Sequence, residues 1–191
     1  LRHGLGLDLA DALVGHPVHL PDLVQGAGLA CALSIVAVDV VAEKLDLARK
    51  LGATDTVDAS AVDDVVAALR EVLPDGYDYV FDAIGKIATT EQAIAALSLG
   101  GAAVIVGLPP AGERASFDPL ALAEADQRIL GSNYGSAVPE RDIPQLVDEV
   151  MAGNLDLASM ISARRPLGEA AAALDDLAAG HALPQLLVPN A

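Results

Sequence analysis

Asp39 is the residue of this sequence whose type and position point most directly to chemistry. It closes an apolar run, residues 35–38, that predicts a strand buried on both faces, and a segment with helical periodicity follows over residues 41–51. A carboxylate at the end of such a strand is suited to accept hydrogen bonds from the two hydroxyls of a ribose, as in dinucleotide-binding folds. The same side chain could instead cap the following helix. The local pattern leaves both interpretations open.

The residues that follow Asp39 favour NAD over NADP as the cofactor of such a site. Val40 and Val41 stand where an NADP-binding protein would place an arginine for the 2′-phosphate. The carboxylate itself would repel that phosphate. We therefore expect NAD.

His16, His19 and Cys31 are further side chains that could bind a metal or react. Pro17 lies between the two histidines and disfavours a regular helix, so we predict a turn with solvated histidines there. Cys31 falls in an Ala- and Gly-rich segment, residues 23–33, which predicts a helix packed closely on a sheet with the thiol as a small buried group. A single cysteine also excludes an internal disulfide and a cysteine-rich zinc site. The sequence thus predicts no metal ligands and no catalytic residue.

The charge and hydropathy of the chain exclude two broad classes of function. A net charge of −16 in 191 residues opposes binding to nucleic-acid phosphates. No apolar run reaches the ~18 residues that a membrane-spanning helix needs. Asp8 and Asp11 interrupt the first apolar stretch, which is therefore unlike a signal peptide. We expect no nucleic acid, no membrane association and a cytoplasmic location.

Strand and helix patterns alternate along the chain at spacings of roughly 20 to 25 residues, which is typical of a doubly wound parallel sheet. Strands are predicted over residues 35–39, 54–58, 77–83, 102–107, 128–134, 159–163 and 185–188. Helices are predicted over residues 41–51, 61–73, 89–99, 120–126, 139–151 and 167–179, the first with an Asp46–Lys50 pair on its surface. The fold class is therefore α/β.

Several of these stretches together resemble the coenzyme-binding half of the zinc-dependent, medium-chain alcohol dehydrogenases. The motifs are IVAVD at residues 35–39, YDYVFDAIG at 77–85, GGAAVIVGLPP at 100–110 and GSNYGS at 131–136. Members that act on alcohols or thiol–formaldehyde adducts look most similar. The resemblance implies a Rossmann-like NAD-binding domain over residues 23–134, followed by a segment of the catalytic domain over residues 135–191.

The resemblance also implies a role for individual residues of the NAD site. Asp39 and Lys44 would bind the adenosine ribose, Val40 would touch the adenine, and Ile84 would line the adenosine side of the cleft. The backbone near Val106, Leu108, Ser132 and Tyr134 would hold the nicotinamide carboxamide. In a complete enzyme of this kind, zinc would assist hydride transfer between a small alcohol or aldehyde and NAD.

Three features depart from the family pattern. The glycine-rich turn expected about 20 residues before Asp39 falls on residues 15–20, where only Gly15 is present, so the first βα unit is not regular. Pro184 stands where the family usually has an arginine against the pyrophosphate. No zinc-ligand constellation or catalytic half is found. We interpret residues 1–22 as non-family sequence produced by a frameshift or a truncation.

Two alternatives to the dehydrogenase interpretation follow from these departures. The chain could be a non-enzymatic remnant, including a module that forms a homo-oligomer through the edge strand at residues 128–134. An adenosyl-methionine methyltransferase would also use a strand-terminal acid for a ribose, but the stretch from Val106 to Pro110 fits it poorly. In the family the tail folds on the catalytic domain, so strands near Ile161 and Leu186 are expected to lack partners.

Overall fold

The structure, a computed structural model, describes residues 34–179 and 184–189. It divides into two units, Leu1–Ala137 and Val138–Ala191. The predictions for the glycine-rich turn, for His16 and His19, and for the helix that contains Cys31 lie outside the described residues.

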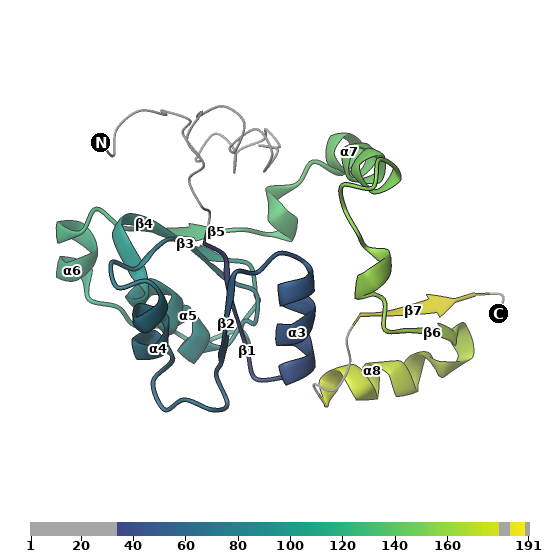
Figure 1. Cartoon of the computed structure of the whole chain (residues 1–191), viewed down its shortest axis with the longest axis horizontal. Helices are drawn as coiled ribbons and strands as arrows, with labels where there is room; N and C mark the ends of the chain where they lie inside the picture. The colour runs from purple at the N-terminus through teal and green to yellow at the C-terminus, as the bar shows by residue number, and fades with distance from the viewer. Residues whose placement is uncertain (1–33, 180–183, 190–191) are drawn as a thin grey trace. The chain divides into compact units, whose positions relative to one another are not determined.

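The first unit starts with two parallel strands joined by a helix (Figure 1). These are β1 (Val36–Asp39), α3 (Ala42–Lys50) and β2 (Asp55–Asp58), and α3 packs on both strands. Asp39 and Asp58 are register partners at the ends of the two strands. Asp46 forms its ion pair with Arg49, at 2.8 Å, and not with Lys50 as predicted. Arg49 also donates to the hydroxyl of Thr56 on β2, which draws its side chain toward the sheet.

The helix that follows starts later than the sequence pattern predicts. It is α4 (Val65–Val72), and Asp64 caps it by accepting a hydrogen bond from the Ala67 amide at 3.0 Å. The residues expected to form its first turn belong instead to a loop in which Asp58 accepts hydrogen bonds from the amide and the hydroxyl of Ser60. Side-chain capping therefore sets this boundary, while the apolar stripe extends beyond it.

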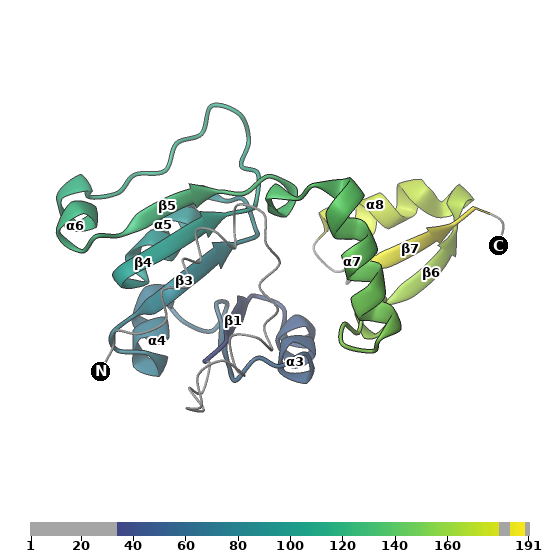
Figure 2. The ribbon, with the colours of Figure 1, turned by 90° about the horizontal axis from the view of Figure 1, so that it is seen from above.

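Three further parallel strands form the centre of the first unit, side by side in the order β3-β4-β5 (Figure 2). The elements are β3 (Tyr77–Asp82), α5 (Ile87–Ala95), β4 (Leu97–Ile105), α6 (Pro119–Glu124) and β5 (Arg128–Gly131). Helix α5 is shorter than predicted, and β4 begins already at Leu97. Strand β5 is also shorter than predicted, because Tyr134–Ser136 forms a short 3-10 helix, η1.

The two groups of strands share a core but are not hydrogen-bonded to each other within the described residues. The buried side chains of Val57, Leu69 and Tyr77 pack together with Val36 and Val38 of β1. In the doubly wound order 3-2-1-4-5-6, strand 1 lies between strands 2 and 4. If β1 to β5 take positions 2 to 6, the place of strand 1 is between β1 and β3. The predicted α/β fold of parallel strands with helices is confirmed.

The described part of the second unit contains two α-helices, two short 3-10 helices and one pair of short strands. Its elements are α7 (Pro139–Met151), η2 (Ala158–Met160), β6 (Ala163–Pro166), η3 (Leu167–Glu169), α8 (Ala170–Ala178) and β7 (Gln185–Val188). The strand predicted over residues 159–163 is wrong: Asp156 accepts a hydrogen bond from the Ser159 amide and holds a 3-10 turn there. The expectation that the tail strands lack partners is also wrong, since β6 and β7 pair with each other in parallel.

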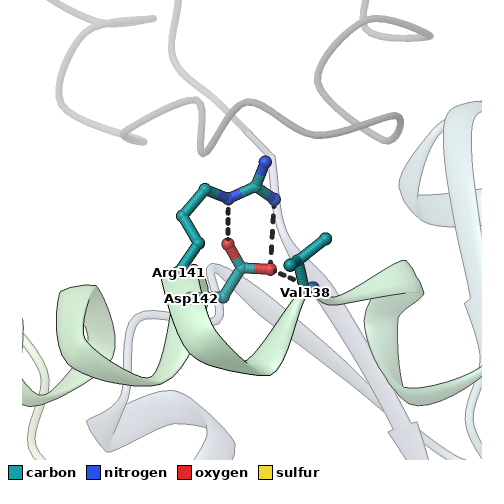
Figure 3. A network of polar contacts seen from close by, with 3 residues as sticks. All are labelled: Val138, Arg141 and Asp142. Carbon is teal, nitrogen blue, oxygen red and sulfur yellow. Dashed lines mark hydrogen bonds and ion pairs between the residues drawn. The ribbon is translucent and has the colours of Figure 1, made fainter.

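The start of α7 is fixed by one carboxylate (Figure 3). Asp142 accepts a hydrogen bond from the Val138 amide at 2.7 Å and forms an ion pair with Arg141 at 2.5 Å. The hydrogen bond from Arg141 holds the pKa of Asp142 below its ordinary value.

None of the helices within the described residues is long and apolar enough to cross a membrane.

Candidate functional site

The predicted cofactor-binding residues lie at or just after the carboxyl ends of parallel strands. Open α/β sheets bind ligands at this edge. The positions are Asp39 at the end of β1, Val40 and Lys44 after it, Ile84 after β3, Val106 and Leu108 after β4, and Ser132 and Tyr134 after β5.

Asp39 is anchored by the backbone that follows it. One of its carboxylate oxygens, Oδ1, accepts hydrogen bonds from the Val40 amide at 2.8 Å and the Val41 amide at 2.9 Å. It is not the cap of α3, because the N-cap position is Val41, which has no side-chain cap bond. A carboxylate offers about four lone-pair sites. The anchored group therefore keeps acceptor capacity for two ligand hydroxyls.

Val40 directly follows Asp39 and Lys44 lies in the helix after it, and both side chains are in contact with solvent. Val40 is 63% exposed, although its neighbours in β1 are half-buried. Lys44 lies in the first turn of α3 and is half-buried, while the next residue, Leu45, faces the core. An exposed apolar side chain next to an anchored carboxylate and an amine is a suitable surface for an adenosine.

Asp82 is a functional candidate that the sequence reasoning missed. It ends β3 as Asp39 ends β1, and it is only 4% exposed. Its Oδ1 accepts hydrogen bonds from the amides of Ile84 and Gly85, at 3.0 and 3.4 Å, and its Oδ2 accepts one from the hydroxyl of Thr90 at 2.7 Å. The strand-terminal acid that singled out Asp39 would have singled out Asp82 as well.

The carboxyl of Asp82 stays charged in this environment. Burial acts to raise its pKa, but hydrogen bonds from Thr90, Ile84, Thr89 and Gly85 outweigh that effect and lower the pKa below its ordinary value. Thr89 and Thr90 lie in the first turn of α5, so the negative charge also faces the positive end of that helix.

The loops after β3 and β4 are held against each other at this edge. The carbonyl oxygen of Asp82 accepts hydrogen bonds from the amides of Val106, at 2.9 Å, and Gly107, at 2.8 Å. A Cβ on Gly107 would lie 2.2 Å from the Gly85 nitrogen, and a Cβ on Gly85 would lie 2.7 Å from the Leu108 nitrogen. Gly85 also has a φ of +78°. Only glycine allows this contact. The amide of Val106 is engaged within the protein.

An open hollow of about 540 Å³ lies beyond the ends of β4 and β5. Leu108 and Ser132 line it together with Gly107 and Asn133. Ser132 is 8% exposed, and its amide donates to the Ile105 carbonyl at 2.9 Å, which joins the ends of the two strands. Tyr134 is 89% exposed and has a φ of +50°. The structure therefore brings Leu108 and Ser132 together around one hollow, while Val106 and Tyr134 are not among its lining residues.

Two other expectations concern groups away from this edge. Pro184 lies in the second unit, where its carbonyl accepts hydrogen bonds from the amide and the hydroxyl of Ser162. Among the residues that the structure describes, no group of three or more His, Cys, Asp or Glu could hold a metal ion.

Comparison with known proteins now identifies the family. The sequence profile described as "Zinc-binding dehydrogenase" matches residues 23–152. The chain belongs to this family. The resemblance inferred from the motifs is confirmed, and the chain corresponds to the coenzyme-binding half of these zinc-dependent dehydrogenases.

Individual members of the zinc-binding dehydrogenases are about one-third identical to the chain. It is 33% identical over 161 residues to a "Probable S-(hydroxymethyl)glutathione dehydrogenase 1" of Schizosaccharomyces pombe, covering 84% of this chain and 42% of the relative. Benzyl alcohol dehydrogenase from Acinetobacter calcoaceticus superposes with a TM-score of 0.74 at 31% identity, covering 82% of this chain and 43% of that one. A putative zinc-binding dehydrogenase from Sinorhizobium meliloti, bound to NADP, gives a TM-score of 0.67 at 30% identity, with 87% and 48% coverage. This chain thus spans less than half the length of each relative.

Proposed function

We propose that this chain forms the NAD-binding part of an oxidoreductase of the zinc-dependent alcohol dehydrogenase type. The anchored carboxylate of Asp39 at the end of β1 is the observation that carries this proposal. Its free acceptor sites would receive the 2′- and 3′-hydroxyls of the adenosine ribose. The fit is local and chemical: a fixed acceptor for a diol, with an exposed apolar side chain and an amine beside it.

The remaining predicted site residues would each contact a different part of the cofactor. Lys44 would hydrogen-bond the same ribose, Val40 would contact the adenine, and Ile84, 54% exposed, would line the adenosine side. The hollow beside Leu108 and Ser132 would receive the nicotinamide. The backbone near Val106 and Tyr134, which does not line the hollow, would assist from the adjoining loops. In this assignment residues 23–134 are the cofactor domain and residues 135–191 belong to the catalytic domain of the longer enzyme.

The chemistry of the longer enzyme would be hydride transfer between a small alcohol or aldehyde and the nicotinamide. Zinc, when bound by the catalytic domain, supplies a Lewis acid for the substrate oxygen. The part described here would bind and orient the nicotinamide ring for that step and would not be active alone. A cytoplasmic location remains a prediction that accompanies this function.

NAD is the proposed cofactor although one similar structure holds NADP. Asp39 carries a carboxylate, and no arginine follows it in the first turn of α3. A 2′-phosphate at this position would meet repulsion from the Asp39 carboxylate, and Lys44 offers only a point charge instead of the bidentate guanidinium that suits a phosphate. We therefore expect NADH to bind more tightly than NADPH.

Titration with NADH, followed by its fluorescence, tests the proposal. We expect saturable binding, and Asp39→Ala should weaken it by about tenfold or more, because hydrogen bonds to a charged group are lost. Asp55→Ala is the matched control: this acid lies at the opposite end of the same strand pair, in register with Val36. No saturable binding below millimolar NADH would contradict the proposal and favour a non-enzymatic remnant.

We also propose that two copies of the chain associate through β5. This strand is hydrogen-bonded to β4 on one side, and no described strand pairs with its other edge. Ile129 on β5 is 37% exposed. We expect a dimer by light scattering and a monomer for Ile129→Lys. Unchanged mass for this variant would contradict the proposed interface.

A further inference from the structure

We infer that Asp82 is a positioning residue for the cofactor site: its carboxylate holds the loop after β3 against the loop after β4 in the geometry that binds NAD. This inference deepens the function proposed above and rests on it. The residue need not touch the cofactor to act. It acts through Ile84 and Leu108, which stand in the two loops.

The side chain of Asp82 fixes the first of these loops. Four donors converge on it: the amides of Ile84 and Gly85, and the hydroxyls of Thr89 and Thr90. The two amides fix the backbone of the turn that carries Ile84 outward, where it is 54% exposed. The two hydroxyls tie that turn to the start of α5. A buried acceptor with this many donors has one arrangement, so the turn has one as well.

The main chain of Asp82 fixes the second loop. Its carbonyl oxygen accepts hydrogen bonds from both Val106 and Gly107. The same loop is in backbone contact with Gly85, because a Cβ on Gly85 would lie 2.7 to 2.8 Å from three backbone atoms of Leu108. A displacement of the Gly85 turn is therefore transmitted to Leu108, which lines the hollow next to Ser132.

The four hydrogen bonds to Asp82 are not shared by the other acid near the opposite end of β3. Asp78, on the same strand, serves as a comparison: it is exposed and accepts one hydrogen bond from the Ser98 hydroxyl at 3.1 Å. The two acids share a strand and differ in which end they occupy. Only the one at the ligand-binding edge is buried and accepts four hydrogen bonds.

Four variants test this inference, through their affinity for NADH and through their amide hydrogen exchange without ligand. They are Asp82→Ala, Thr90→Val, Thr90→Ser and Asp78→Ala. Asp82→Ala should weaken NADH binding by about tenfold or more, and Thr90→Val by about threefold, because one hydrogen bond is lost. Thr90→Ser keeps the hydroxyl and should bind like the original chain, as should Asp78→Ala. If Asp82→Ala does not fold, the Thr90→Val and Thr90→Ser pair decides.

The exchange measurement separates this inference from the proposed function. In Asp82→Ala and Thr90→Val, exchange should become faster at the amides of residues 84–85 and 106–108 while the amides of β1 and β2 are unchanged. A purely structural role would change all of them together or none. If folded Asp82→Ala and Thr90→Val bind NADH as tightly as the original chain while Asp39→Ala binds it more weakly, the inference is overturned and the proposed function is not. Failure of the unmodified chain to bind NADH contradicts the proposed function, and unchanged exchange at both loops overturns the inference independently.

Discussion

The two units of this chain bury their side chains to very different extents. In the first, Leu97 and Val104 of β4 are 2% and 1% exposed, and buried residues occur in β2, β3, β4, α3, α4 and α5. In the second, no described residue is buried, although α7 and α8 are amphipathic. Ile143, Leu146 and Val147 of α7 are all more than half exposed. The first unit has a core of its own, whereas the second presents apolar side chains without one.

This difference indicates how each unit obtains its stability. Burial of apolar area is the main favourable contribution to folding, and helices short of about 12 residues are marginal in isolation. The second unit has one 13-residue helix, one nine-residue helix and two four-residue strands. We infer that the second unit depends on packing against other polypeptide and that the first does not.

Separating the units at Ala137 gives the largest expected effect. A polypeptide of residues 1–137 should unfold in one cooperative thermal transition, because its buried residues form connected clusters. Residues 138–191 alone should show no cooperative transition by circular dichroism. A sharp transition in the isolated second unit would contradict the comparison.

Truncating one leucine in each unit tests the same difference more locally. Leu97→Ala should lower the free energy of unfolding by about 2–5 kcal/mol, because it leaves a cavity among fully buried neighbours. Leu177→Ala in α8, where the side chain is 60% exposed, should change it by less than about 0.5 kcal/mol. Urea denaturation measures both. Equal effects would mean that the two units are packed alike.

A methyl group added to a glycine tests the loop contact of the first unit. Gly107→Ala should destabilise the chain by about 1–3 kcal/mol, because its Cβ would lie 2.2 Å from the Gly85 nitrogen. It should also weaken NADH binding. Gly168→Ala in the second unit has nothing within 4 Å of the added Cβ and should be nearly neutral. Denaturation midpoints of the two variants decide.

Acid should affect the two units through different carboxylates. The pKa of Asp82 is lowered relative to its ordinary value of 3.8, so the folded state favours the charged form. Its contribution to stability is present above pH 3.8 and is lost as pH falls through the lower pKa of the folded state. Asp82→Asn should therefore reduce the slope of unfolding free energy against pH below 3.8. The pKa of Asp142 is lowered as well, but its position at the surface predicts a smaller change for Asp142→Asn.

Surface ion pairs should give the smallest effects in both units. Asp46→Asn removes the ion pair between Arg49 and Asp46, whose two side chains are 54% and 66% exposed respectively. The free energy of unfolding should therefore fall by less than about 0.5 kcal/mol. Asp176→Asn removes the pair with Arg165 in the second unit, which is more enclosed, and its cost should approach about 1 kcal/mol. Denaturant titration at low and high salt measures both. A larger effect for Asp46→Asn would reverse the order.

Sequence patterns located most of these elements and missed the features that depend on side-chain hydrogen bonds. The bounds of α7 and β7 agree with the prediction, because Pro139 suits the first turn of a helix and residues 185–188 are bounded by a proline and a short turn. The predicted start of α4 and the predicted position of β6 were wrong, because periodicity does not reveal the cap at Asp64 or the hydrogen bond from the Ser159 amide to Asp156.

The residues of the candidate site were predicted by two different arguments. Asp39 followed from the strand pattern, because it ends an apolar strand, whereas Leu108 followed only from the family resemblance. The four donors to Asp82 all lie within eight residues of it. The contact between Gly85 and Gly107, in contrast, joins two loops that are far apart in the sequence. No local pattern carries that information.

The side-chain cluster between the strand pair β1-β2 and the trio β3-β4-β5 has a consequence for how the first unit opens. Val57, Leu69 and Tyr77 form one buried cluster with Val36 and Val38, so residues of both groups of strands lose packing contacts when this cluster is disturbed. We therefore expect a cavity at its centre, as in Val57→Ala, to speed amide exchange in the pair and in the trio together.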